Sequence, residues 1–240
     1  MNIAIIFAGG VGKRMQTNGL PKQFLEIDDK PILVHTLLHF QNNPQIDKIV
    51  IVMVSSYIDH TWELVKKYDL NKVCSVVEGG STGQESIYHG LVEAEKVSTG
   101  DESAIVLIHD GVRPIIDKDL IDRNIASVKQ YGSAISSAIC NETIITIDDE
   151  GGIKDVPERS KSFMARAPQS FYLKDIISLH RKCIEMGKNN VIDSCTMMND
   201  FGKKVHIVST ISQNIKVTNP EDYYLAESII KMNNGTMKKV

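Results

Sequence analysis

The chain has 240 residues, 27 basic against 30 acidic side chains and 42% hydrophobic residues. This composition is typical of a soluble globular protein, and the net charge of −3 argues against broad nucleic-acid binding, which normally needs a basic excess. No apolar run approaches the roughly 18 residues of a membrane span, so no membrane partner is expected. Four cysteines without a CxxC pair indicate buried free thiols and a cytoplasmic protein.

Short apolar segments alternate with amphipathic ones through the first 140 residues. Strands are predicted over residues 3–7, 48–54, 73–77, 104–109 and 133–140, and helices over 31–41, 59–68, 84–97 and 118–130. Strands that are apolar at every position suit a sheet covered on both faces. The alternation predicts an α/β fold with a doubly wound, mostly parallel sheet, and a ligand site at the carboxyl ends of its strands.

The pattern changes between about residues 141 and 167. A β-branched segment, a turn at Asp148-Asp149-Glu150-Gly151-Gly152 and a return strand over 153–156 predict a projecting β-hairpin arm, and residues 157–161 are too polar for a core. Beyond the arm, a helix is predicted over 173–186, strands over 205–208 and 215–217, and a last helix beginning at Pro220 with Asn219 as its N-cap. We interpret residues 1–240 as one domain that carries this arm.

The first strand ends in the loop Ala8-Gly9-Gly10-Val11-Gly12-Lys13-Arg14. Glycines let backbone N–H groups approach an anion closely, but a tight turn explains the loop equally well. A Walker A loop would need Ser or Thr at Arg14, and a dinucleotide site would need an acidic residue ending the second strand. Lys22 follows as a third cation, which we expect to face solvent. Three cations on one connection favour a bound anion such as a nucleoside triphosphate.

Two later strand ends also carry polar groups. The segment 78–86, EGGSTGQES, has glycines and hydroxyls that suit a base or ribose, although by itself it fits an ordinary helix start. In the segment 109–114, HDGVRP, Asp110 beside phosphates would be a natural Mg²⁺ ligand, because Mg²⁺ prefers oxygen ligands. A loop cap is the alternative for Asp110, and for His109 we favour a satisfied buried imidazole over a functional one.

Six motifs in this order span nearly the whole chain: AGGVGKRM (8–15), LPKQF (20–24), GG…QES (79–86), HDGVRP (109–114), APQSF (167–171) and NIKVTNPED (214–222). Together they resemble the cytidylyltransferases that activate polyol phosphates. These are the ribitol-5-phosphate enzymes of teichoic-acid and capsule precursor synthesis and the 2-C-methyl-D-erythritol 4-phosphate enzymes of isoprenoid synthesis. The resemblance implies a Rossmann-like nucleotidyltransferase sheet and a Mg²⁺-dependent reaction of CTP with a polyol phosphate.

The resemblance also implies a role for each residue that matches a family motif. The CTP site would be lined by Ala8, Gly9, Gly10, Gly12, Gly80, Ser81 and Ser86. The cations that hold the triphosphate and stabilise charge at the α-phosphorus would be Arg14, Lys22 and Lys216. Asp110 would bind Mg²⁺, and the polyol phosphate would be held by Arg113, Thr143 and Arg159. Family members are homodimers whose arm crosses to the partner, so a homodimer with arm exchange is expected.

Two details favour ribitol 5-phosphate as the acceptor, with methylerythritol phosphate as the alternative. The loop length before LPKQFL matches ribitol-type members, and Ile192 stands where the methylerythritol enzymes usually have Thr. Gly83 and Gly111 depart from both groups, which commonly have Arg and Ala at these positions, and another short polyol phosphate therefore stays open.

Two other classes of function fit the sequence less well than a cytidylyltransferase. A nicotinamide dehydrogenase would need the complete glycine fingerprint and the acidic ribose ligand, and the chain has neither. A catalytically inactive interaction module would not need Arg14, Lys22, Asp110 and Lys216 together at strand ends.

Overall fold

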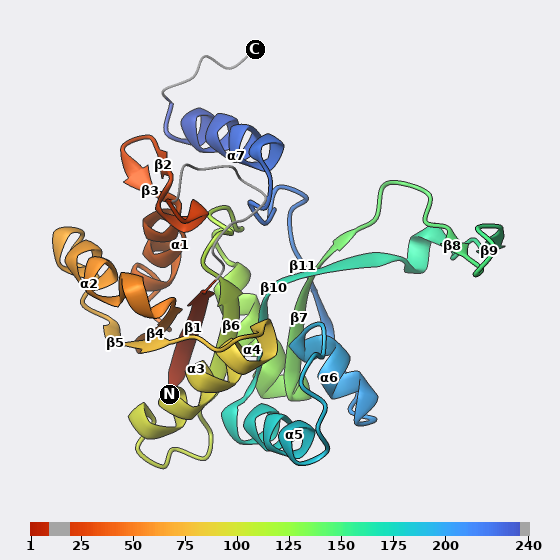
Figure 1. The fold of residues 1–240 in the computed structure, drawn as a ribbon, viewed down its shortest axis with the longest axis horizontal. Coiled ribbons are helices and arrows are strands. Elements are labelled where there is room, and N and C mark those ends of the chain that lie inside the picture. Colours follow the sequence, from red (N-terminus) through yellow and green to blue (C-terminus); the bar gives the residue numbers. More distant parts are fainter. Residues whose placement is uncertain (10–19, 236–240) are drawn as a thin grey trace.

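The computed structural model describes residues 1–9 and 20–235, so the predictions for Gly10, Gly12 and Arg14 lie outside the described residues. A seven-stranded sheet runs through the body in the order β11-β7-β10-β6-β1-β4-β5 (Figure 1). Its strands are β1 (Asn2–Ala8), β4 (Lys48–Met53), β5 (Val73–Glu78), β6 (Ile105–Asp110), β7 (Ser133–Ile139), β10 (Phe163–Tyr172) and β11 (Ile207–Ser209). Neighbours pair in parallel, except that β10 is antiparallel to β6 and β7. The predicted mostly parallel α/β sheet is confirmed.

Helices cover both faces of this sheet. One face packs against α1 (Ile32–Gln41), α2 (Ile58–Lys67) and α4 (Leu120–Tyr131), and the other against α3 (Gly83–Val97), α5 (Leu173–Glu185) and α6 (Ser194–Asp200). In β1, Ala4 and Ile6 belong to the first core and Ile3 and Ile5 to the second. Because side chains alternate between the faces of a strand, a doubly covered strand is apolar at every position, as the sequence indicated.

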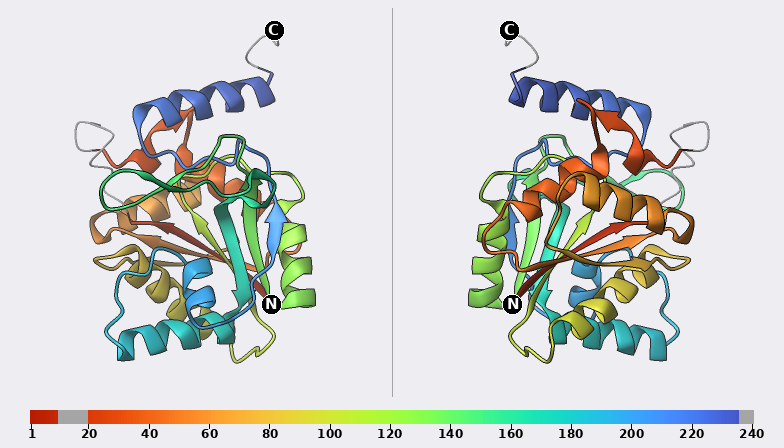
Figure 2. Two further views of the ribbon diagram at one scale, coloured as in Figure 1. Left: turned by 90° about the vertical axis from the view of Figure 1, so that its right-hand side faces the viewer. Right: turned by 90° about the vertical axis from the view of Figure 1, so that its left-hand side faces the viewer.

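A third, smaller core lies beyond the carboxyl end of the sheet. There α7 (Pro220–Asn233) packs over a short hairpin of β2 (Glu26–Ile27) and β3 (Lys30–Pro31), and Figure 2 shows this helix lying across the top of the sheet. The predicted N-cap is confirmed: the Asn219 side chain accepts from the Asp222 N–H, and Asp222 accepts in return from the Asn219 N–H. Across residues 1–9 and 20–235, every helix is too short or too polar to span a bilayer.

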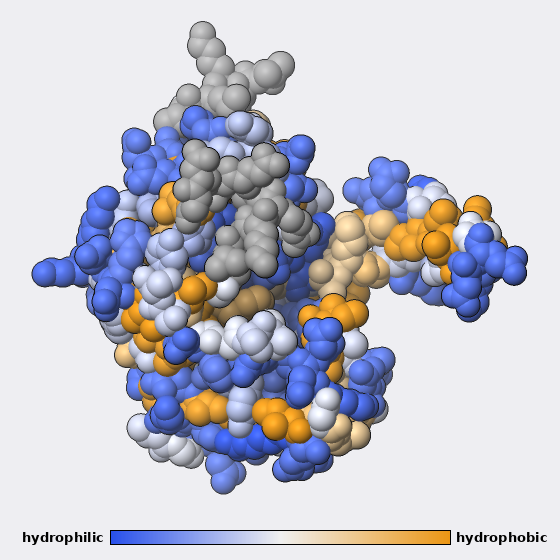
Figure 3. Space-filling model, viewed as in Figure 1, coloured by the Kyte–Doolittle hydropathy of each residue, from blue (hydrophilic) through white to orange (hydrophobic). Residues whose placement is uncertain are grey.

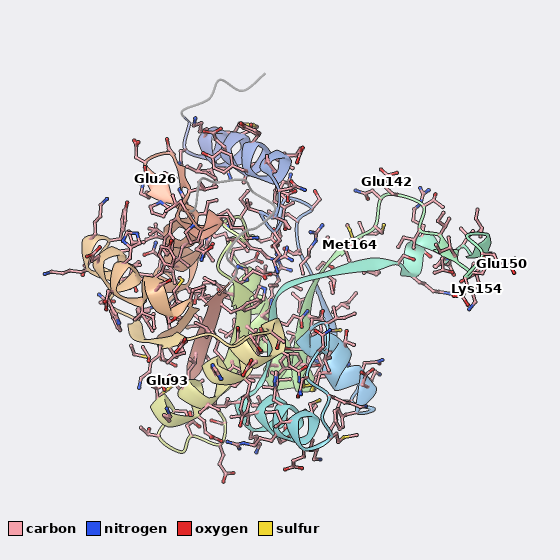
Figure 4. The ribbon with its side chains drawn as sticks, in the orientation of Figure 1. Glu26, Glu93, Glu142, Glu150, Lys154 and Met164 are labelled. Atoms are coloured by element: carbon pink, nitrogen blue, oxygen red, sulfur yellow. The ribbon has the colours of Figure 1, made fainter. Side chains whose placement is uncertain are left out.

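The predicted arm is also confirmed. Beyond the ends of β7 and β10, the chain forms a hairpin of β8 (Thr146–Ile147) and β9 (Ile153–Asp155) and then the short 3-10 helix Arg159–Lys161, all projecting from the body (Figure 1). Glu142, Glu150 and Lys154 are spread along this arm, while Met164 lies nearer the body (Figure 4). The arm also has exposed apolar side chains, and Figure 3 shows hydrophobic surface at its outer end. They are Ile145, Ile147, Ile153 and Val156.

The structure corrects the sequence predictions in several places. It adds the β2–β3 hairpin, β10 and α6, which were not predicted, and residues 215–217 are not a strand. Val217 does donate its N–H to the Val112 carbonyl at 2.9 Å, but Val112 lies in a loop, so no ladder forms. All four cysteines are free, as expected, but only Cys140 and Cys183 are buried, while Cys195 is partly buried and Cys74 is exposed.

Candidate active site

The carboxyl ends of β1, β5 and β6 surround one cavity of about 340 Å³. Parallel strands end at the same edge of a sheet, which is where α/β proteins bind ligands. The described residues of the predicted CTP site and the described predicted cations all line this cavity, together with the predicted metal ligand. They are Ala8, Gly9, Gly80, Ser81, Ser86, Lys22, Lys216 and Asp110.

Ser86 fixes the loop that follows β5. Its hydroxyl accepts a hydrogen bond from the Gly80 N–H at 3.0 Å and donates to the Thr82 carbonyl at 2.9 Å. Glu85 accepts from both the hydroxyl and the N–H of Ser81, and these hydrogen bonds lower the pKa of Glu85. Thr82 caps α3, so the segment is a helix start as well as a cavity wall. Ser86 therefore holds the loop of residues 80–82 in place at the wall of the cavity.

Lys22 joins two segments that lie far apart in the chain. Its ammonium donates to the Val217 carbonyl at 2.8 Å, and the neighbouring Gln23 amide donates to the Ala8 carbonyl at 2.7 Å. Lys22 is only 9% exposed, because the 3-10 helix Lys22–Phe24 buries its side chains against the body. The expectation that Lys22 faces solvent is wrong: it is a buried cation in the cavity wall.

Asp110 lies at the centre of an ion-pair network. Its Oδ2 accepts from Arg113 Nε at 2.7 Å, and its Oδ1 lies 2.5 Å from Lys216 Nζ. Burial by itself would raise the pKa of Asp110, but the Lys216 and Arg113 charges outweigh it and lower the pKa to about 2. Asp110 is therefore an anion at neutral pH. Arg113 is anchored further by its Nη1, which donates to the Asn214 carbonyl at 2.9 Å.

The donor set at Asp110 fits a Mg²⁺ ion that is completed by substrate. Among the described residues no group of three or more His, Cys, Asp or Glu side chains is placed to hold a metal. Mg²⁺ is commonly held by one or two carboxylates, with waters and substrate phosphates completing its octahedron. The Lys216 side chain is 43% exposed, so a ligand in the cavity can reach its ammonium.

A second cavity of about 260 Å³ adjoins the first. It shares Phe7, Gly83, Asp110 and Lys216 with the first cavity and extends to Arg113 and Gln169. Three further residues of this cavity were not singled out from the sequence: Arg166, Gln169 and Asp193. In the sequence, only the position of Arg166 directly before the APQSF motif could have pointed to it. In the structure, Asp193 caps α6 by accepting from the Thr196 N–H.

The two glycines that depart from the family pattern have different surroundings. A Cβ added to Gly111 would lie 2.8 Å from Ala8 Cβ and 3.1 Å from Leu33 Cδ1, whereas one added to Gly83 would meet no described atom within 4 Å. A side chain at Gly111 would therefore force Ala8 or Leu33 to shift. Gly83 lines both cavities, and there is open space where its side chain would lie.

Thr143 and Arg159, the other predicted acceptor residues, lie together on the arm. Arg159 Nη2 donates to Thr143 Oγ1 at 2.9 Å, and both side chains are exposed. The arm extends away from the body of its own chain (Figure 1), and neither residue lines the cavities formed by the described residues. The fold brings these two residues to each other and not to Asp110 or Lys216.

His109 is a buried imidazole, as favoured from the sequence, but it is only partly satisfied, because its buried Nδ1 has no hydrogen-bond partner among the described residues. It is fully buried beside Phe40, and its Nε2 lies 3.2 Å from the Arg113 carbonyl. Burial lowers the pKa of His109 to about 3, so the ring is neutral at physiological pH. It supports the backbone of the Asp110–Arg113 turn.

Comparison with known proteins gives one consistent result. The family model IspD: 2-C-methyl-D-erythritol 4-phosphate cytidylyltransferase matches residues 2–232. The ribitol-5-phosphate cytidylyltransferase of Streptococcus agalactiae serotype Ia is 49% identical over 229 residues, 95% of each chain. The 2-C-methyl-D-erythritol 4-phosphate cytidylyltransferase of Clostridium botulinum strain Loch Maree is 38% identical and covers 96% of this chain and 97% of its own. The structure of 4-diphosphocytidyl-2C-methyl-D-erythritol synthase from Anaerococcus prevotii matches with a TM-score of 0.81, at 26% identity and 96% coverage of both chains.

Proposed function

This chain belongs to the IspD family of cytidylyltransferases, and from that premise we propose that it transfers the cytidylyl group of CTP to D-ribitol 5-phosphate and releases pyrophosphate. The observation that carries the proposal is a pair of adjoining cavities that share Asp110 and Lys216 in their linings. The first is lined by the predicted nucleotide residues, and the second has room for an acceptor. An acceptor phosphate at the shared residues would lie beside the α-phosphorus of a nucleotide in the first cavity.

The cations of the site provide most of the chemistry. An oxygen of the acceptor phosphate attacks the α-phosphorus of CTP and forms a P–O bond, while the bond to the pyrophosphate oxygen breaks and pyrophosphate leaves with that electron pair. A phosphomonoester has a second pKa of about 6, so it is already ionised and needs no general base. Lys22 and Lys216 stabilise the charge that spreads over the phosphate oxygens, the kind of preorganised electrostatic contribution that dominates such transfers. Arg14 is proposed as a third cation from the glycine-rich loop.

Mg²⁺ is proposed as the cofactor, with Asp110 as its protein ligand. A bound Mg²⁺ would neutralise triphosphate charge and orient it. Asp110 suits this role because it stays ionised, with its pKa lowered to about 2. Lys216, displaced from Asp110, would then reach the phosphate oxygens.

Ribitol 5-phosphate is proposed as the acceptor because the ribitol-type relative is the more similar, at 49% identity against 38%. The sequence features around Lys22 and Ile192 point in the same direction. Methylerythritol phosphate stays the alternative, since the family model carries that name. CDP-ribitol would be a precursor for teichoic acid or capsule, made in the cytoplasm, where the four free thiols are stable.

The active unit is proposed to be a homodimer with exchanged arms. Thr143 and Arg159 belong to the arm that projects from the body (Figure 1) and line neither cavity of their own chain, and the exposed isoleucines of the arm need a partner surface. A two-fold dimer would place each arm over the other body. One catalytic domain over residues 1–240, with a dimerisation arm at about 141–167, stays a prediction.

The proposal is tested by pyrophosphate release from CTP with D-ribitol 5-phosphate, methylerythritol phosphate and other short polyol phosphates. We expect ribitol 5-phosphate to be used at least about tenfold more efficiently than methylerythritol phosphate, a ratio that needs only about 1.4 kcal/mol of differential transition-state binding. CTP should be preferred to ATP, and EDTA should stop the reaction. More efficient use of methylerythritol phosphate than of ribitol 5-phosphate would refute the ribitol assignment but not the cytidylyltransferase activity. No pyrophosphate from any acceptor refutes the activity itself.

A further inference from the structure

Arg166 is a cation of the second cavity with no anionic partner in the part of the chain that the structure describes. The other described body arginines pair with carboxylates: Arg113 with Asp110, Arg123 with Asp117 and Asp119, and Arg181 with Glu95. Arg166 makes one weak contact, from Nη2 to Met164 Sδ at 3.7 Å, and its buried Nε has no hydrogen-bond partner. A buried donor without a partner is costly, so an acceptor from outside the chain would satisfy it.

The local backbone directs Arg166 into the cavity. β10 pairs with β7 at Ala165 and again at Gln169, and the register shifts between these two residues. Such an irregularity bends a strand and re-aims its side chains, often beside a binding site. Asn214 Nδ2 donates to the Ala167 carbonyl at 2.8 Å and so holds the irregular segment against the chain next to Lys216. Arg166 lines the cavity from this position.

The charges of the cavity select an anion. Burial lowers the pKa of Arg166, and the nearby Arg113 charge lowers it further, yet a guanidinium remains charged in proteins. The carboxylates of the cavity are already bound: Asp110 by Arg113 and Lys216, and Asp193 by the Gln169 amide and the Thr196 N–H. An anionic ligand would relieve the repulsion between Arg113 and Arg166.

We propose that Arg166 binds the phosphate of the acceptor and makes a phosphomonoester, rather than a free polyol, the required substrate. This inference rests on the proposed function and names a residue of the same site. The planar guanidinium fork matches two phosphate oxygens, which a lysine cannot reproduce. Arg166 acts from the same chain as Lys216, so it holds the acceptor phosphate at the residues shared by the two cavities independently of the partner's arm.

The test compares Arg166→Gln and Arg166→Lys with Arg181→Gln, which removes an exposed arginine outside the site. With D-ribitol 5-phosphate as the varied substrate, Arg166→Gln should raise the acceptor KM by about 10- to 100-fold, the scale of a lost charge-assisted hydrogen bond. The KM for CTP should stay within about twofold. Arg166→Lys should be intermediate, because it keeps the charge but loses the fork, and Arg181→Gln should match wild type.

Several results would overturn the inference. An unchanged acceptor KM would do so, as would an equal rise in the KM for CTP, or an acceptor effect that follows a loss of dimer mass or melting temperature. If the wild type uses methylerythritol phosphate instead, the ribitol proposal fails, and the same KM comparison with that acceptor still tests Arg166. If neither acceptor is used, titration calorimetry measures the binding of inorganic phosphate to wild type and to Arg166→Gln with CTP present. Equal phosphate affinity in the two proteins would refute the inference.

Discussion

The ammonium of Lys22 donates to the Val217 carbonyl at 2.8 Å from a side chain that is 9% exposed. Its hydrogen bond connects the first strand-to-helix connection to a segment near the other end of the chain. The same ammonium lines the cavity proposed for CTP. Substitution of Lys22 should therefore affect both the free energy of unfolding and the chemical step, and the two effects have to be separated.

We predict that Lys22→Ala and Lys22→Met each lower kcat by roughly 10²–10³, the scale of removing one preorganised charge stabiliser. Lys22→Ala should also lower the melting temperature by several degrees. It leaves a buried carbonyl without its donor, at about 1–3 kcal/mol, and each kcal/mol shifts the melting temperature of a chain of this size by about 2–4 °C. Lys22→Met removes the same donor but fills the space that Lys22→Ala leaves empty, so it avoids the cost of a cavity and should lose less stability.

Kinetics well below the lower melting temperature, with calorimetric melting of both variants, make this comparison. Near-normal turnover in Lys22→Met would contradict the catalytic assignment. Activity that follows melting temperature across the two variants would reduce Lys22 to a structural residue.

The sequence was enough to predict which residues meet at the site, but not how buried they are or which residues they contact. Lys22, Asp110 and Lys216 were assigned from motifs and do meet at one cavity. The burial of Lys22 depends on a contact across 195 positions, which no local pattern can indicate. Arg166 was missed because its proposed role depends on a buried Nε without a partner among the described residues and on a register shift, both of which are properties of the folded chain.

Among the elements, those with local signals were predicted and those made by distant pairing were not. β1 and β4 are continuous apolar runs, and α7 has its N-cap and proline in sequence. β10 contains Pro168 and several polar residues, which argue against a central strand. Its place between β6 and β7 is decided by antiparallel pairing with both. Residues 215–217 have strand composition but lie against a loop, so composition was misleading there.

Helix α3 provides a test of how closely an element packs on the sheet. It crosses β1 and β4 at Gly90, where an added Cβ would lie 2.5 Å from Ile5 Cγ2 and 2.8 Å from Val52 Cγ2. We predict that Gly90→Ala lowers the free energy of unfolding, because overpacking a core costs about 1–3 kcal/mol. The gain in helix propensity on replacing glycine, up to about 1 kcal/mol, offsets only part of this.

Gly83→Ala is the matched control in the same helix, because an added Cβ there meets no described atom within 4 Å. Its free energy of unfolding should be unchanged or slightly raised. Denaturant titration of both variants measures the difference. Equal stabilities for the two variants would show that α3 can shift away from the sheet at no cost.

At the scale of the whole molecule, the body and the arm contain different parts of the proposed site. The body has the cavities with Lys22, Asp110 and Lys216, and the arm has Thr143 and Arg159 bonded to each other at 2.9 Å. The arm projects from the body (Figures 1 and 4), and its outer end exposes hydrophobic surface (Figure 3). A second copy of the chain can both complete the site and cover the exposed hydrophobic surface of the arm.

Arm exchange makes a quantitative prediction for mixed dimers. Lys22→Ala and Arg159→Ala should each be nearly inactive alone and should complement each other after co-refolding. In a mixed dimer one site receives both defects, and the other combines an intact body with an intact arm. Random pairing makes about half of the dimers mixed, and half of their sites are whole, so activity should approach about one quarter of wild type by the two-fold symmetry of the dimer.

The matched control mixes Lys22→Ala with Lys216→Ala. Both residues belong to the body, so every site in every dimer keeps a defect and no activity should return. Recovery in this control would show that mixing stabilises the enzyme without sharing sites. If Arg159 serves its own chain, the first mixture behaves like the control, because each site keeps either the Lys22 or the Arg159 defect. Mixed dimers confirmed by mass, with no more activity than the control, would therefore refute the shared site and leave the body cavities to bind the acceptor phosphate alone.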